Sequence, residues 1–178
     1  MKGLILFTSQ YGSTADYASW ISEATGLPTH DLRNGDIELS DYDFLVLGSP
    51  IYYFKPKLRK WIERHLATIL NKPVFFFTVS GAGDGEKLRD WLVRSLPQTF
   101  ISYMQHVALR GRMNPSQLSF FHRAMLKIGS LFNKDLAAKT EELQGFNYVD
   151  KASIAPLVGM INKLLAKQAE MKISVISH

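Results

Sequence analysis

The chain has 178 residues, of which 46% are hydrophobic, and it contains no cysteine. This length and composition suit one globular domain, and they exclude disulfides, thiolate nucleophiles and cysteine-ligated iron–sulfur or zinc centres. The formal net charge is +5, and residues 104–178 carry the whole excess, because they hold 10 basic but only 5 acidic side chains. This asymmetry indicates an anionic partner for the last third of the chain or, equally, ordinary solubilising charge.

Short apolar runs alternate with segments of helical periodicity along the chain. The apolar runs predict strands at residues 2–7, 44–48, 73–79 and 106–109, and a weaker strand is predicted at residues 28–33. The periodic segments predict helices at residues 13–24, 57–70, 86–96 and 150–168, the last of which Pro156 can break. This alternation predicts the α/β class: a three-layer, doubly wound sheet of five parallel strands, with helices on both faces and right-handed crossovers.

Residues 110–149 do not fit this alternation. Apolar side chains recur there at helical spacing, at Leu118, Phe121, Met125 and Ile128. Residues 110–134 carry five basic side chains and no acidic one. We therefore predict a basic helical insertion before the last helix, within a single domain spanning residues 1–178. The apolar stripe of residues 115–133 packs in the core or, alternatively, lies on an anionic membrane surface.

The sequence contains no signal for membrane insertion or export. No window reaches the about 18 to 20 uninterrupted apolar residues that a membrane span needs, and the N-terminal apolar run is too short for a signal peptide. We expect a cytoplasmic protein, with peripheral contact to the inner face of the cell membrane as the alternative. His65, His106 and His122 lack the spacing of metal ligands, so no metal is predicted.

The loop after the first predicted strand has the composition of an anion site. In doubly wound sheets, ligands bind at the carboxyl ends of the strands. Residues 8–14 offer four hydroxyl side chains, one glycine and the start of a helix, which together suit a phosphate monoester. The pattern is neither a Walker A sequence nor a dinucleotide fingerprint. A plain turn with a Ser or Thr helix cap is the alternative.

Two further loops follow the third and fourth predicted strands. Residues 48–54 contain three consecutive aromatics, Tyr52, Tyr53 and Phe54. Stacking on a flat ring would explain at least one of them, and we expect Tyr52 or Tyr53 to face a ligand while the others pack beneath the loop. The small residues of the 78–85 loop permit close approach of the backbone to a planar ring; the alternative is a flexible turn in which Asp84 caps the next helix.

These loops resemble those of the flavodoxins. Residues 9–14 (Ser-Gln-Tyr-Gly-Ser-Thr) are similar to the flavodoxin phosphate loop, and residues 48–52 (Gly-Ser-Pro-Ile-Tyr) to the loop beside the flavin ring. The resemblance covers residues 1–109 and the last helix, and it implies the strand order 2-1-3-4-5 and FMN as the cofactor. The cofactor-binding residues that it implies are Ser9, Gln10, Tyr11, Gly12, Ser13, Thr14, Ser49, Pro50, Ile51, Tyr52, Tyr53, Val79, Ser80, Gly81, Ala82 and Gly83.

The later part of the chain is similar to one subfamily. Residues 108–110 (Ala-Leu-Arg), the basic aromatic stretch 120–127 and residues 140–142 (Thr-Glu-Glu) resemble the menaquinone-dependent protoporphyrinogen IX dehydrogenases. This resemblance implies an oxidoreductase that passes electrons from a porphyrinogen to a quinone. Arg110 and Arg112 would then be substrate residues, because paired guanidinium hydrogen bonds suit a carboxylate. No catalytic residue is identified.

Two features separate the chain from carrier flavodoxins. The chain is basic, whereas carriers are acidic around the flavin, and its third loop lacks the aromatic that usually covers the second face of the ring. An open face would leave room for a substrate. The alternative function is an electron carrier that docks with an acidic protein partner. A regulatory module or a nucleic-acid-binding protein is disfavoured, because the first strand ends in Thr8 and Ser9 rather than acidic residues and no nucleic-acid module is recognisable.

Overall fold

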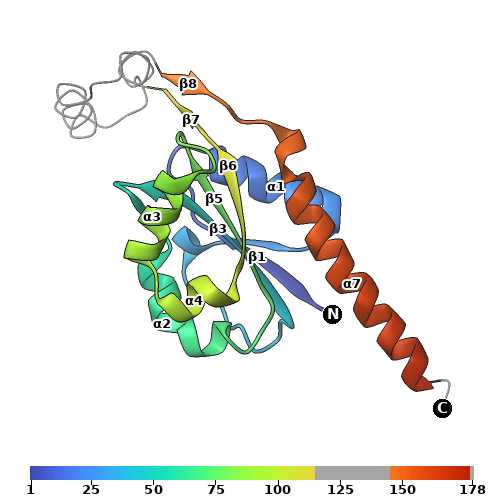
Figure 1. Cartoon of the computed structure of the whole chain (residues 1–178). Coiled ribbons are helices and arrows are strands. Elements are labelled where there is room, and N and C mark those ends of the chain that lie inside the picture. Colours follow the sequence, from blue (N-terminus) through green and yellow to red (C-terminus); the bar gives the residue numbers. More distant parts are fainter. Residues whose placement is uncertain (115–144, 177–178) are drawn as a thin grey trace.

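The computed structural model describes residues 1–114 and 145–176, and its side chains up to residue 171. Most of the predicted insertion at 110–149, including the stripe at 115–133, lies outside the described residues. Figure 1 shows a central sheet with helices on both sides. In the part of the chain that is described, no helix is long and apolar enough to cross a membrane.

Five parallel strands form the sheet, in the order β2-β1-β3-β5-β6. Their bounds are Gly3–Phe7 (β1), Thr29–Asp31 (β2), Phe44–Tyr52 (β3), Val74–Ser80 (β5) and Gln105–Arg110 (β6). The predicted order 2-1-3-4-5 is confirmed, because β4 is a two-residue strand, Lys55–Pro56, that pairs antiparallel with the end of β3. The predicted α/β class and parallel sheet are confirmed with it.

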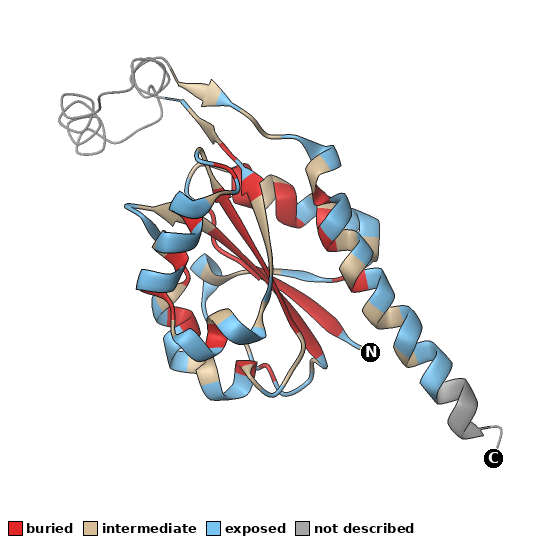
Figure 2. Ribbon diagram, viewed as in Figure 1, coloured by how far each residue is buried: buried red, intermediate tan, exposed pale blue. Residues whose placement is uncertain are grey.

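The helices cover the two faces of the sheet. Helices α1 (Ser13–Thr25) and α7 (Ala155–Ile176) lie on one face; α2 (Arg59–Ile69), α3 (Glu86–Ser95) and the short α4 (Gln98–Tyr103) lie on the other. Strand β1 shows why both faces are apolar: Ile5 and Phe7 join the core beneath α1 and α7, while Leu4 and Leu6 join the core beneath α2 and α3. Figure 2 shows the buried strands between exposed helix surfaces.

Several predicted boundaries were wrong. Strand β3 continues four residues past the predicted end at Gly48, because it turns back through Tyr53 and Phe54 to pair with β4. The last helix is not broken at Pro156. A short 3-10 turn, η3 (Lys151–Ile154), precedes α7, and Pro156 lies in the first turn of α7, where its missing N–H has no partner to lose. A second 3-10 turn, η1 (Leu32–Asn34), follows β2.

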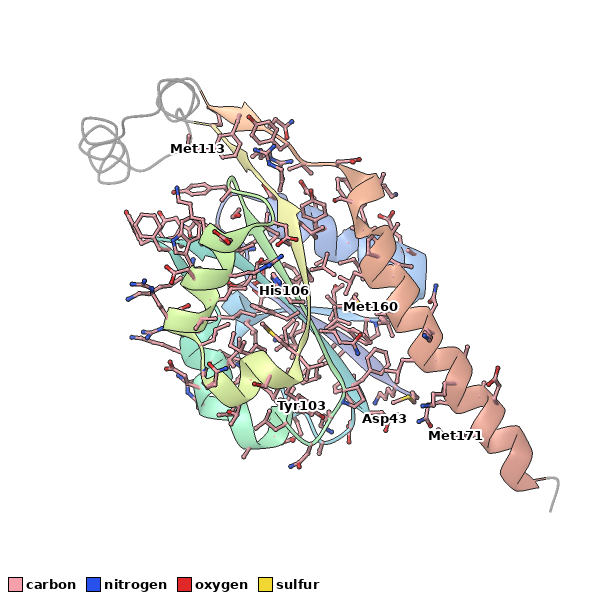
Figure 3. All side chains as sticks on the ribbon, in the orientation of Figure 1. Asp43, Tyr103, His106, Met113, Met160 and Met171 are labelled. Carbon is pink, nitrogen blue, oxygen red and sulfur yellow. The ribbon has the colours of Figure 1, made fainter. Side chains whose placement is uncertain are left out.

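The two ends of the predicted helical insertion are extended rather than helical. Residues Arg112–Met113 (β7) and Phe146–Asn147 (β8) pair as an antiparallel ribbon, with Arg112 opposite Asn147 and Met113 opposite Phe146. The ribbon projects beyond the carboxyl end of β6, and Met113 is labelled on it in Figure 3. The ribbon therefore lies at the edge of the sheet where the three predicted ligand loops begin.

Candidate functional site

The first loop joins β1 to α1 and gathers buried hydroxyl groups at the start of that helix. Ser9, Ser13 and Thr14 are all buried. The residue before the helix is Gly12, with φ +91°, so no hydroxyl side chain occupies the cap position that the alternative reading required. The Ser9 hydroxyl accepts a hydrogen bond from the backbone N–H of Ala15 at 3.4 Å. The positive end of the helix dipole and three hydroxyl side chains thus lie at the same end of α1, a combination that suits an anion.

The ribbon contacts this loop through Arg112. The backbone N–H of Arg112 donates to the Ser13 hydroxyl at 3.1 Å, and its guanidinium Nη1 lies 2.6 Å from Oδ2 of Asp16. A Cβ on Gly12 would lie 2.8 Å from Nη2 of Arg112. The positive φ of Gly12 favours glycine at this position, and a larger residue there would also displace the guanidinium packed against it.

The second loop presents aromatic side chains on a tight hairpin. Tyr53 and Phe54, between the paired residues Tyr52 and Lys55, have φ values of +46° and +63°. This left-handed conformation normally selects Asn and Gly in two-residue hairpins, and two bulky residues there store strain of about 1–3 kcal/mol each. Tyr53 and Phe54 are 47% and 62% exposed. The hairpin thus presents aromatic rings at the carboxyl edge of the sheet, although the positive φ values of Tyr53 and Phe54 make its backbone strained.

Tyr52 connects the second loop to the first. Its hydroxyl lies 3.4 Å from that of Tyr11, and its ring packs edge-on against Tyr53 with centroids 4.7 Å apart. Burial, and then the neighbouring Tyr11 hydroxyl, raise the pKa of Tyr52 well above its usual value. Lys57 adds a second connection by donating to Oε1 of Gln10. Ser49, in contrast, is fully buried, and its hydroxyl accepts from Leu58 N–H at 3.1 Å and so supports the start of α2.

The third loop leaves β5 at Ser80 and is covered by residues from the ribbon. A Cβ on Gly81 would lie 2.6 Å from the ring of Phe146. The Phe146 ring stacks on Tyr148 at 5.2 Å, and the guanidinium of Arg110 lies 3.4 Å above the Tyr148 ring while donating to the Gly81 carbonyl at 3.0 Å. The third loop itself has no aromatic residue, as expected. However, Phe146 of β8 packs on this loop, and the sequence did not predict that contact.

Gly111 joins the first and third loops. Its N–H donates to the Ser80 carbonyl at 2.9 Å, and its own carbonyl accepts from Tyr148 N–H at 3.1 Å. A Cβ at this position would lie 3.1 Å from Val79 and 3.7 Å from the Ser13 hydroxyl. The crossing from β6 to β7 therefore runs directly between the two loops, and the residues on either side of it, Arg110 and Arg112, reach different loops.

The sequence of the chain matches a known family. Residues 4–138 match the flavodoxin domain family. The chain belongs to this family. No protein of curated function is significantly similar to it in sequence.

The chain is also similar to several solved structures. The Trp repressor binding protein of Bacillus subtilis is 18% identical, with 75% of this chain and 99% of that one aligned at a TM-score of 0.49. A flavoprotein of Lactobacillus acidophilus in complex with FMN is 14% identical (61% and 91% aligned, TM-score 0.44). A Fusobacterium nucleatum flavodoxin bound to FMN is 18% identical (67% and 75% aligned, TM-score 0.39).

The groups at the edge of this flavodoxin domain suit a phosphate attached to a planar ring. The first loop provides the hydroxyls and the helix N-terminus for the phosphate. The Ser80 hydroxyl oxygen is the only side-chain polar atom, within residues 1–114 and 145–171, that is fully buried without a hydrogen-bond partner. Such an atom indicates a polar group that the protein alone does not supply. All sixteen predicted cofactor residues lie in the three loops at this edge or in the ends of β3, β5 and α1 that flank them.

Sequence reasoning missed Phe146 and Tyr148 as residues of the site. Phe146 and Tyr148 are two positions apart, and side chains at alternate positions of an extended segment share one face. This spacing could have indicated that both aromatics face the site. The alternative role for Asp84 was wrong: Gly85 precedes α3, and Asp84 instead lies 4.0 Å from Arg89. In the described residues, no three His, Asp or Glu side chains are grouped as metal ligands would be.

Beneath the third loop, His106 is part of the sheet rather than of the site. Its Nε2 lies 2.9 Å from the hydroxyl of Thr78 on the adjacent strand, and its ring is labelled among the packed side chains of Figure 3. Burial lowers the pKa of His106 below its usual value, and nearby Asp84 opposes this only in part. His106 is therefore a structural histidine of the sheet, and its lowered pKa favours the neutral ring.

Proposed function

We propose that this flavodoxin domain binds FMN at the carboxyl edge of its sheet and acts as a redox protein. The observation that carries the proposal is the cluster of buried hydroxyls at the start of α1, from Ser9, Ser13 and Thr14, in a chain of the flavodoxin domain family. Bound FMN supplies the hydride or electron transfer. The loops of the chain would hold the phosphate, orient the ring and limit its contact with water.

Each loop has a distinct part in this proposal. The first loop donates hydrogen bonds to the phosphate. The second loop lays Tyr52 or Tyr53 along one face of the ring, a contact that the strained hairpin at Tyr53 and Phe54 maintains. The third loop brings the backbone of Gly81 and the buried Ser80 hydroxyl to the polar edge of the ring, where that hydroxyl would gain a partner.

A finer proposal is that the protein is an oxidoreductase of the protoporphyrinogen IX dehydrogenase type, with a quinone as electron acceptor. The support is the basic last third of the chain and the exposed Arg110, whose guanidinium is held over Tyr148 beside the third loop. From there it can hold a carboxylate of a substrate at the flavin edge. Arg112, which contacts Asp16 at the first loop, is the weaker candidate for this role.

The second candidate is an electron carrier that docks with a protein partner. The exposed Tyr53 and Phe54 on the hairpin favour it, since aromatic side chains at a surface are enriched in protein contacts. Phe54 packs on Trp91 of α3 with ring centroids 5.1 Å apart, so the hairpin and that helix present a joint aromatic surface.

Titration of the purified protein with FMN tests the common part of the proposal. We expect saturation at one FMN per chain, followed by its flavin absorbance bands; absence of binding would overturn both candidates. Anaerobic reduction then separates them. A carrier should take up electrons in two separated one-electron steps, whereas the dehydrogenase should be reduced in one two-electron step and be reoxidised by a water-soluble quinone. Failure of every quinone analogue to reoxidise it would overturn the dehydrogenase proposal.

A further inference from the structure

Arg112 lies against the first loop, where its positive charge would add to the attraction of the helix N-terminus for a phosphate. Its backbone N–H donates a hydrogen bond to the Ser13 hydroxyl, and its guanidinium forms an ion pair with Asp16. These two contacts come from different parts of the residue, so the side chain is oriented as well as placed. They direct Nη2 to Gly12, where a Cβ would lie only 2.8 Å away.

The negative charge of Asp16 must be neutralised if the first loop is to bind an anion. Asp16 lies in the first turn of α1, where a carboxylate occupies the positive end of the helix dipole. An unpaired carboxylate there would repel a bound phosphate. The ion pair with Arg112 cancels that charge, and a guanidinium carries five N–H donors, more than one carboxylate contact uses.

We propose that Arg112 is a phosphate-binding residue of the first loop and makes the site selective for FMN over riboflavin. This inference rests on the proposed FMN site and extends it, because it assigns the β7–β8 ribbon to the phosphate end of the cofactor. Arg110, two residues earlier, remains at the ring end beside Gly81. The end of β6 and the start of the ribbon therefore contact the two ends of one site.

The test is the ratio of dissociation constants for riboflavin and FMN, measured by flavin fluorescence. Riboflavin has the same ring but no phosphate. We expect Arg112→Gln to weaken FMN binding at least about tenfold, the range of a lost charge-assisted hydrogen bond, and to leave riboflavin binding unchanged. We expect the double variant Asp16→Asn, Arg112→Gln to recover part of the loss, because the repelling carboxylate is removed.

Lys151→Gln is the matched control. Lys151, in η3, forms an ion pair at 2.9 Å with Glu23, near the other end of α1 from Asp16, so the substitution removes one positive charge that is likewise paired with a carboxylate of α1. We expect no change in its riboflavin-to-FMN ratio. The FMN affinity of the wild type should also fall with added salt more steeply than that of Arg112→Gln.

The outcomes are distinct. An equal loss of riboflavin and FMN binding in Arg112→Gln, or no loss of either, overturns the assignment of Arg112 while leaving the FMN site in place. A comparable change in Lys151→Gln also overturns it, since the effect would then be one of net charge. Failure of the wild type to bind FMN overturns the proposed function itself.

Discussion

The first and third loops belong to one site but are built in different ways. The first loop draws its hydroxyls from one continuous segment, residues 8–14, that leads directly into α1. The third loop is short and bare, and its covering side chains, Phe146 and Tyr148, come from a ribbon far along the chain. The comparison teaches that the hydroxyls of the first loop can be predicted from local sequence, whereas Arg112 beside that loop and the aromatics over the third loop depend on long-range packing.

Tyr17→Phe should have the largest effect on stability, because Tyr17 holds the ribbon in place beside the two loops. The Tyr17 hydroxyl is shared by both ends of the ribbon, since it donates to the Arg110 carbonyl at 2.7 Å and accepts from Asp150 N–H at 3.1 Å. Removing it leaves two polar groups without this partner, and we expect the free energy of unfolding to fall by about 2–3 kcal/mol. Hydrogen exchange should quicken at residues 110–113 and 145–150. Unchanged exchange in the ribbon would mean that Tyr17 does not anchor it.

Gly12→Ala tests the first loop. The positive φ should cost about 1–2 kcal/mol of unfolding free energy, and the new methyl group should also displace the Arg112 guanidinium. Gly35→Ala is the control, because Gly35 also has a positive φ but nothing within 4 Å of its Cβ position. Denaturant unfolding should show destabilisation of both variants, whereas only Gly12→Ala should lose FMN affinity. Equal FMN affinities would contradict the account of Gly12.

Gly81→Ala tests the covering of the third loop. Its methyl group would meet the Phe146 ring at 2.6 Å, so the ring must shift, at a cost of about 1 kcal/mol. The control is Gly85→Ala in the same loop, where nothing lies within 4 Å. Aromatic NMR signals of Phe146 and Tyr148 should move in the first variant only. Signals that stay in place would show that the ribbon does not cover this loop.

His106 gives the smallest expected effect, a pH dependence of stability. Because burial depresses its pKa in the folded protein, the unfolded chain binds a proton that the folded chain does not. The contribution of neutral His106 is therefore complete above about pH 6.5 and declines as the pH falls below that value, by up to about 1.4 kcal/mol per pH unit. Unfolding free energies between pH 7.5 and 5.5 should show a smaller slope in His106→Gln; equal slopes would contradict a buried neutral histidine.

The sequence predicted those parts of the molecule whose structure follows from the pattern of apolar and polar residues within a short segment. The parallel sheet and the hydroxyl loop came from apolar runs followed by a polar segment and a periodic helix, whereas the strand order came from the resemblance to the flavodoxins. The six residues of α4, Gln98–Tyr103, are too few to show periodicity. Strand β4 depends on positive φ at Tyr53 and Phe54, which no propensity rule assigns to aromatic residues. The single domain over residues 1–178, the partners and the membrane contact stay predictions.

The most direct test of the account is to map FMN on the amide NMR spectrum of the protein. The central claim is that three loops and the ribbon form one FMN site. Amide shifts on adding FMN should concentrate in residues 8–14, 49–53, 79–83 and 110–112, and riboflavin should reproduce all of them except those at the first loop and Arg112. Shifts confined to other surfaces, or none at saturating FMN, would contradict the claim.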